Sequence, residues 1–309
     1  MEALVEVILP IFLVLGFGYG VRWRGGITDD QVTGLMRFAQ GFGLPCLLFR
    51  AISTLDLGQS FDVRLLFSFY TGALTSFVIA LLAAHFLFRR AWEDSVAIGF
   101  AALFSNGLLL GLPITQRAYG DHALTGNFTV LAFHSPFCYG VGITVMEVVR
   151  HRGRGFWRTA RQVLRSMFSN SLVLGITLGF IVNLTHLPVP RVAGEALDML
   201  AKSAVPVALF GLGGVLYRYR PEGDFRIIAM VCACSLLLHP AITYTLSRSL
   251  GVSVPYLRSG VVMAAMAPGV NSYLFADMYG VGRRIAASSL LLATAATVLT
   301  AWFWLSILP

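Results

Sequence analysis

Apolar runs about as long as a membrane is thick recur from one end of this 309-residue chain to the other. A helix that spans a bilayer needs roughly 20 mostly apolar residues, because the hydrocarbon core is about 30 Å thick. Ten stretches have this character, namely residues 4–21, 31–53, 64–88, 94–118, 123–149, 169–186, 196–217, 226–248, 256–279 and 285–307. The sequence therefore predicts an all-α polytopic membrane protein with ten transmembrane helices.

The composition also favours a bilayer over water as the solvent of this chain. Hydrophobic residues make up 57% of the sequence and charged residues 12%, whereas soluble domains carry about 25% charged residues. Once the ten spans are removed, the longest remaining segment is a short basic linker, residues 151–168. The net charge of +8 comes mostly from loops, which indicates a topology signal and contact with anionic lipid rather than nucleic-acid binding.

The basic residues also predict the direction in which the chain crosses the membrane. Lys and Arg stay preferentially in cytoplasmic loops. One set of alternate loops holds 15 basic residues, six of them between Arg150 and Arg165, and the other set holds seven. If the loops richer in Lys and Arg are cytoplasmic, both termini lie on the outer side of the membrane. The predicted location is the cell (inner) membrane.

Four short motifs recur at almost the same distance along the chain. They are L-V-L-G at Leu13 and Leu172, P-x-x-L-F at Pro45 and Pro206, D-x-R at Asp62 and Asp224, and Y-G at Tyr119 and Tyr279. We interpret them as a duplication, with a first five-helix repeat in residues 1–150 and a second in residues 169–309. Because five is odd, the second repeat enters the membrane upside down, and inverted repeats are typical of secondary transporters.

The fourth and ninth spans, which correspond under this repeat, each carry residues that break helices. Proline removes a backbone donor, and irregular backbone survives in a membrane only where protein buries it or where it lines a wet cavity. A kink is the alternative for either span alone, but transporter sites lie where two such breaks meet. The predicted substrate-binding residues are Asn106, Gly107 and Pro113 in the fourth span and Pro268, Gly269, Asn271 and Ser272 in the ninth.

His134 lies centrally in the fifth span and is either a further member of this site or a hydrogen-bonded core residue. No Asp or Glu falls in the central third of any predicted span, although cation carriers usually keep carboxylates there. Free N–H groups at helix breaks, together with Asn, Ser and His, therefore favour a small organic anion. Near the outer end of the seventh span, Asp198 and Lys202 have the i,i+4 spacing of a helix-surface pair.

Enzymatic function is not expected, because the chemistry it needs at membrane depth is missing. The sequence has neither H-E-x-x-H nor G-x-S-x-G, and no pair of Asp residues within a span. The four cysteines, Cys46, Cys138, Cys232 and Cys234, match no metal or disulfide spacing. We predict no metal and no cofactor. A channel and a membrane-embedded ligand sensor are the competing classes.

The same motifs resemble those of the auxin efflux carrier family. The resemblance rests on P-x-x-L-F in the second span, on the stretch from Ser105 to Gly120, and on the stretch from Pro268 to Tyr279. It covers nearly the whole chain. The short linker after the fifth span is similar to that of bacterial members, many of them permeases assigned to malonate and related acids. The plant PIN-FORMED carriers have a large cytoplasmic loop there.

This resemblance implies a fold shared with bile-acid/sodium symporters and with sodium/proton antiporters. Spans 1, 2, 6 and 7 would form a scaffold and spans 3–5 and 8–10 a transport unit, with spans 4 and 9 as crossover helices. On that template Asn106, Pro113, Asn271 and Ser272 match the crossover positions. Plant carriers typically have a second proline where this chain has Ser272, which argues against auxin as the substrate.

The expected function is thus a secondary transporter that moves a small organic anion, a carboxylate, across the membrane by alternating access. A coupling proton or sodium ion, and assembly as a homodimer, are compatible with it. The alternatives are a membrane-embedded ligand sensor and an ion-coupled symporter of a neutral polar solute.

Overall fold

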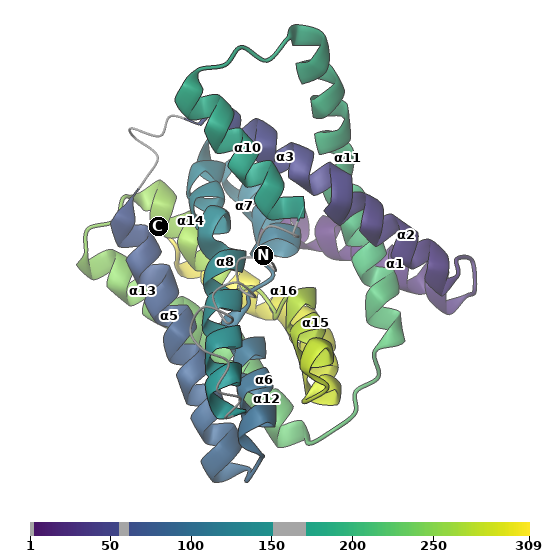
Figure 1. Ribbon diagram of the computed structural model, residues 1–309, viewed down its shortest axis with the longest axis vertical. Helices are drawn as coiled ribbons and strands as arrows, with labels where there is room; N and C mark the ends of the chain where they lie inside the picture. The colour runs from purple at the N-terminus through teal and green to yellow at the C-terminus, as the bar shows by residue number, and fades with distance from the viewer. Residues whose placement is uncertain (1–2, 56–61, 151–170) are drawn as a thin grey trace. The chain divides into compact units, whose positions relative to one another are not determined.

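The computed structural model describes residues 3–55, 62–150 and 171–309, and the described chain is helical (Figure 1). No β-strand occurs in these residues, and the isolated antiparallel bridge recorded among them joins Ser105 to Pro268. The all-α class predicted from the apolar runs is confirmed. The predicted linker, residues 151–168, lies outside the described residues.

Within the described residues, seven helical stretches are long and apolar enough to cross a membrane, which indicates a multi-pass membrane protein. Five of them are built on α1 (Leu9–Trp23), α5 (Val63–Leu82), α8 (Leu124–Val149), α11 (Arg191–Arg218) and α16 (Arg283–Ile307). The other two each join a pair of helices through a short π-helical segment. These pairs are α2 (Asp29–Phe38) with α3 (Leu44–Ser53), and α12 (Phe225–Ala233) with α13 (His239–Ser249).

The remaining three predicted spans are shorter or interrupted. The described part of the sixth is α10 (Ser171–Thr185). The fourth consists of α6 (Trp92–Leu103), three non-helical residues, a π-helical segment (Gly107–Gly111) and α7 (Leu112–Tyr119). The ninth consists of α14 (Val254–Ala264) and α15 (Val270–Tyr279). The count of ten spans therefore stays a prediction.

The chain divides into two compact units. Unit 1 comprises Met1–Leu9, Asp62–Val163 and Tyr219–Pro309, and unit 2 comprises Pro10–Phe61 and Leu164–Arg218. Each unit thus combines segments from both halves of the sequence, because contacts within a unit join helices that lie far apart along the chain.

Close helix packing holds unit 2 together. A Cβ added at Gly18 of α1 would collide with the carbonyl oxygen of Phe210 in α11, so these two helices meet backbone to backbone. Arg50 of α3 donates from Nε to Asp198 Oδ1 of α11 at 2.6 Å. The recorded ion pair of Asp198 is therefore with Arg50 rather than with Lys202, because the fold brings α3 and α11 together.

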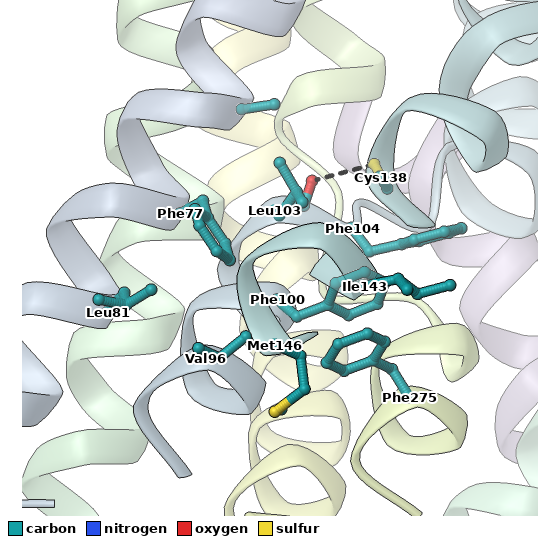
Figure 2. Packing of buried hydrophobic residues seen from close by; sticks show 11 residues of the cluster. Phe77, Leu81, Val96, Phe100, Leu103, Phe104, Cys138, Ile143, Met146 and Phe275 are labelled. Carbon is teal, nitrogen blue, oxygen red and sulfur yellow. Dashed lines mark hydrogen bonds between the residues drawn. The ribbon is translucent and has the colours of Figure 1, made fainter. Parts of the chain in front are cut away.

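A hydrophobic core cluster of unit 1 lies between α5, α6, α8 and α15 (Figure 2). Its largest members include Phe100 of α6 and Phe275 of α15, whose rings stack with centroids 3.9 Å apart. Ile143 and Met146 of α8 pack beside them and are fully buried. Lipid tails are as apolar as these side chains, so close van der Waals packing rather than transfer from water holds them together. This packing joins both interrupted helices to α8.

Candidate functional site

The two helix interruptions of unit 1 lie against each other and complete each other's hydrogen bonds. Residues 104–106 run antiparallel to residues 267–269. The Asn106 backbone N–H donates to the Ala267 carbonyl at 2.8 Å, and the Gly269 N–H donates to the Phe104 carbonyl, also at 2.8 Å. Each break thus supplies the partner that the other lost when its helix ended, and irregular backbone becomes tolerable in an apolar setting.

Polar side chains at this junction are buried without being satisfied. Asn106 is 5% exposed, and its Nδ2 has no hydrogen-bond partner in the described part of the chain. The Ser105 hydroxyl is likewise buried and unpartnered among those residues. A buried polar group without a partner costs about 1–3 kcal/mol, so the amide of Asn106 is a donor held ready for an acceptor.

Helix α15 begins directly after this junction. Its N-cap is Gly269, which offers no side chain to the N–H groups of the first turn, and of these the Ser272 N–H donates to the Gly269 carbonyl at 2.9 Å. Asn271 lies in that turn, and its Oδ1 accepts a hydrogen bond from the Tyr139 hydroxyl of α8 at 3.3 Å. Ser272 is buried and donates its hydroxyl to the Gly269 carbonyl at 2.7 Å. With its oxygen engaged by Tyr139, the Asn271 amide retains its N–H donors.

His134 is attached to the same junction from α8. Its Nε2 lies 3.1 Å from the Ser105 carbonyl oxygen, and because a carbonyl only accepts, Nε2 carries the hydrogen. Its Nδ1 lies 3.8 Å from Cys138 Sγ. The ring is 3% exposed and packs edge-on against Phe104, with centroids 4.7 Å apart. His134 is therefore a hydrogen-bonded core residue that contacts the junction, and its membership of a substrate site stays a prediction.

The remaining predicted residues shape the fourth-span side of the junction. A Cβ at Gly107 would overlap the terminal methyl group of Met263 in α14, so Gly107 packs directly against that flexible side chain. Pro113 is buried near the start of α7, at the end of the π-helical segment. Because proline has no N–H, the π-helical hydrogen bonds that run from Gly111 and Leu112 cannot continue through it.

The structure brings together Asn106, Pro268 and Gly269 through the backbone, and His134 through Ser105. Asn271 and Ser272 follow in the first turn of α15, while Pro113 lies further along, beyond the π-helical segment. Tyr139 was not expected from the sequence, because no local spacing links it to Asn271, 132 residues away. The recorded side-chain partners of these residues are uncharged within the described ranges.

Comparisons with known proteins cover almost the whole chain. The model of a family described as membrane transport protein matches residues 3–151 and 144–305. A Rhizobium meliloti protein, provisionally named a malonate transporter, is 23% identical over 97% of this chain and 94% of its own. Auxin efflux carrier component 5 of Arabidopsis thaliana is 22% identical over 89% of this chain and 88% of its own. An uncharacterized transporter of Methanothermobacter thermautotrophicus is 26% identical over 85% and 86% respectively.

Proposed function

The chain belongs to the membrane transport protein family, with auxin efflux carriers among its relatives, and from this premise we propose that it carries a small organic anion by alternating access. It is a membrane transporter and not an enzyme. The proposal concerns what the transporter binds, where it binds it, and which part of the chain moves.

The observation that carries the proposal is the unsatisfied Asn106 amide. Its Nδ2 is buried and has no partner among the described residues, and its backbone is tied to the segment from which α15 starts. A donor kept buried at this cost indicates an acceptor that is present for part of the transport cycle. We assign that acceptor to the substrate.

The available groups favour an anion over a cation. The N–H groups of Val270 and Asn271 at the start of α15 and the side-chain amides of Asn106 and Asn271 are donors, and the positive end of the α15 dipole lies at the same place. Tyr139 already donates to the carbonyl oxygen of Asn271, which leaves that oxygen one lone pair fewer for a cation. A carboxylate has only acceptor atoms and matches this set. The provisional name of the Rhizobium meliloti relative makes malonate the first compound to test.

An inverted repeat is supported by paired local features of unit 1. Helices α6 and α14, which precede the two breaks, have 12 and 11 residues. Helices α7 and α15, which follow the breaks, end at Tyr119 and Tyr279, and the next residue is a glycine with φ of 81° and 76° respectively. Asp62 and Asp224 cap α5 and α12 alike, each accepting from the backbone N–H two residues on.

Alternating access then assigns different roles to the two units. Unit 2 contains span 1 from Pro10 onward together with the segments of spans 2, 6 and 7, and we assign it the role of scaffold. Unit 1 contains the segments of spans 3–5 and 8–10 together with every predicted site residue, and we assign it the role of the transport unit. The α6–α7 and α14–α15 stretches are then the crossover helices. We further propose an inner-membrane location with both termini outside, on the loop charges.

The test begins with the purified protein. A thermal-shift screen of mono- and dicarboxylates, malonate included, identifies an anion that binds, and uptake into proteoliposomes shows whether it is carried. Losing a hydrogen bond to a charged group costs about 1.5–3 kcal/mol, which is roughly a 10- to 150-fold loss of affinity. Asn106→Ala and Asn271→Ala should each lose affinity in this range, with unfolding temperatures close to that of the parent.

Gln116→Ala is the matched control, because it removes a side-chain amide from α7 that is exposed and bonded to Asp121. It should bind like the parent. The proposal is wrong if no carboxylate binds or is taken up by the parent, or if both asparagine variants equal it. Binding without uptake would identify a membrane-embedded ligand sensor. Preferential uptake of a neutral polar solute would identify an ion-coupled symporter of such a solute.

A further inference from the structure

Two histidines are buried together in unit 1, and the proposed function gives no role to a charge on either of them. His134 of α8 is 3% exposed and His239 of α13 is 0% exposed. Both pack against the ring of Phe69 in α5, with centroid separations of 5.6 Å and 4.7 Å. They come from segments 105 positions apart in the sequence, yet Phe69 places the two imidazoles around a single aromatic ring.

The hydrogen bonds determine the tautomer of each imidazole ring. His134 Nε2 lies 3.1 Å from the Ser105 carbonyl, and His239 Nε2 lies 3.1 Å from the Phe69 carbonyl. Each Nε2 is therefore a donor, which leaves each Nδ1 with a lone pair. His134 Nδ1 faces Cys138 Sγ, and His239 Nδ1 is buried without a partner in the described residues. Both rings can thus accept a proton at Nδ1.

In the described part of the chain, no fixed charge contacts either ring to hold such a proton permanently. Among the described residues, the other titratable groups with a recorded contact to His134 are Cys138 of α8 and Tyr70 of α5, whose ring centroid lies 6.4 Å away. Thr243 and the backbone at Gly72 adjoin His239. Within the described ranges no Asp, Glu, Lys or Arg has a recorded contact with either ring. A buried imidazolium needs a negative partner, and two adjacent ones repel, so at most one proton is held.

An anion in the proposed site supplies that negative partner. His134 is hydrogen-bonded to Ser105, the residue next to Asn106. Reciprocal linkage then requires that the anion raises the proton affinity of the pair and that the proton raises the anion affinity. Resting on the proposed function, we propose that the His134–His239 pair binds one proton together with the anion, so that the carrier is a proton–anion symporter. The proton comes from water, adds to an Nδ1 lone pair, and leaves with the anion.

The experiment is calorimetric titration of the purified parent with malonate, or with the carboxylate that the screen identifies, in two buffers of different ionisation enthalpy. The difference between the buffers counts protons taken up, at a pH above the carboxyl pKa values of the probe. The parent should take up as much as one proton when it binds the probe. Its Kd for the probe should therefore rise by up to about tenfold for each unit by which the pH is raised. In proteoliposomes an inward proton gradient should drive accumulation of the probe.

His134→Gln and His239→Gln test the pair itself, because glutamine keeps an N–H donor for the carbonyl but takes no proton. His134→Gln should bind the anion less tightly than the parent, because the favourable linkage to the proton is lost. Its count of protons taken up should be near zero, and a proton gradient should no longer drive accumulation of the anion. His239→Gln should reduce the proton count. His85→Gln, outside this cluster and stacked on Trp92 at 3.6 Å, should behave like the parent.

The outcomes separate this inference from the proposed function. If the parent binds no carboxylate, the proposed function fails. If the parent binds and carries the probe without taking up protons, or a sodium gradient drives accumulation instead, the proposed function stands and proton coupling by this pair is refuted. Proton uptake that persists in His134→Gln and His239→Gln alike would also refute it.

Discussion

Arg150 joins both interrupted helices at one end of unit 1, which makes its removal a sharp test of how that unit is held. It follows the last residue of α8. Its Nε donates to Glu93 Oε1 in the first turn of α6 at 2.9 Å. Its Nη2 donates to the carbonyl of Tyr279, the last residue of α15, at 2.8 Å, and its guanidinium lies 4.9 Å from the centre of the Tyr279 ring. One side chain therefore ties three helices.

The magnitude follows from these three contacts. The charged hydrogen bond to a carbonyl is worth about 1.5–3 kcal/mol. The ion pair is worth about 0.2–1 kcal/mol, because the Glu93 side chain is 42% exposed. The ring contact adds about 0.5–1 kcal/mol. Since these contacts share one side chain and do not add fully, we expect Arg150→Met to lower the free energy of unfolding by about 2–4 kcal/mol.

Denaturant unfolding of the detergent-solubilised protein, followed by tryptophan fluorescence, measures this loss. Arg248→Met is the matched control, because the contact recorded for the Arg248 side chain is the Tyr244 ring at 6.0 Å. It should cost at most about 1 kcal/mol. Glu93→Gln should cost less than Arg150→Met, since the bond to Tyr279 survives. If Arg150→Met is as stable as Arg248→Met, the assignment of Arg150 as the tie between these helices is refuted.

Two further predictions concern packing and orientation. Gly18→Ala should destabilise unit 2 by about 1–3 kcal/mol, because its Cβ would collide with the rigid Phe210 carbonyl. Gly16→Ala is the control on the same helix, since a Cβ there would meet nothing within 4 Å, and it should be neutral in the same unfolding assay. A single cysteine placed at position 154 of a cysteine-free chain should resist an impermeant thiol reagent applied to intact cells, and labelling from outside would reverse the proposed topology.

The fold class could be predicted from the sequence because the thickness of a bilayer sets the length of a spanning helix. That length is visible directly as the number of consecutive apolar residues. The breaks could be placed because proline and glycine act on the backbone locally, whatever packs around them. The predicted residues Asn106 and Gly269 accordingly lie at the junction between α6 and α15.

Partnerships between distant residues could not be predicted. Tyr139 meets Asn271, and Arg50 meets Asp198, 148 positions away, only because helices pack in a particular order. Local spacing instead suggested Lys202 as the partner of Asp198. Asn183 is a similar case, since its Nδ2 donates to the carbonyls of Ile52 and Leu55 and so caps the end of α3 from another segment. An amide near a helix end carries no sequence signal for such a role.

The reciprocal hydrogen bonds between residues 104–106 and 267–269 also bear on how the chain is made. Synthesis delivers the Phe104 carbonyl and the Asn106 N–H to the membrane long before Ala267 and Gly269 exist. An unsatisfied backbone group in lipid costs several kcal/mol. The nascent first half must therefore keep this stretch wound as continuous helix, hydrated, or held by the insertion machinery. The hydrogen bonds of residues 104–106 can form only after residues 267–269 have been synthesised and inserted. The candidate site is therefore completed late in biogenesis, and in a single step.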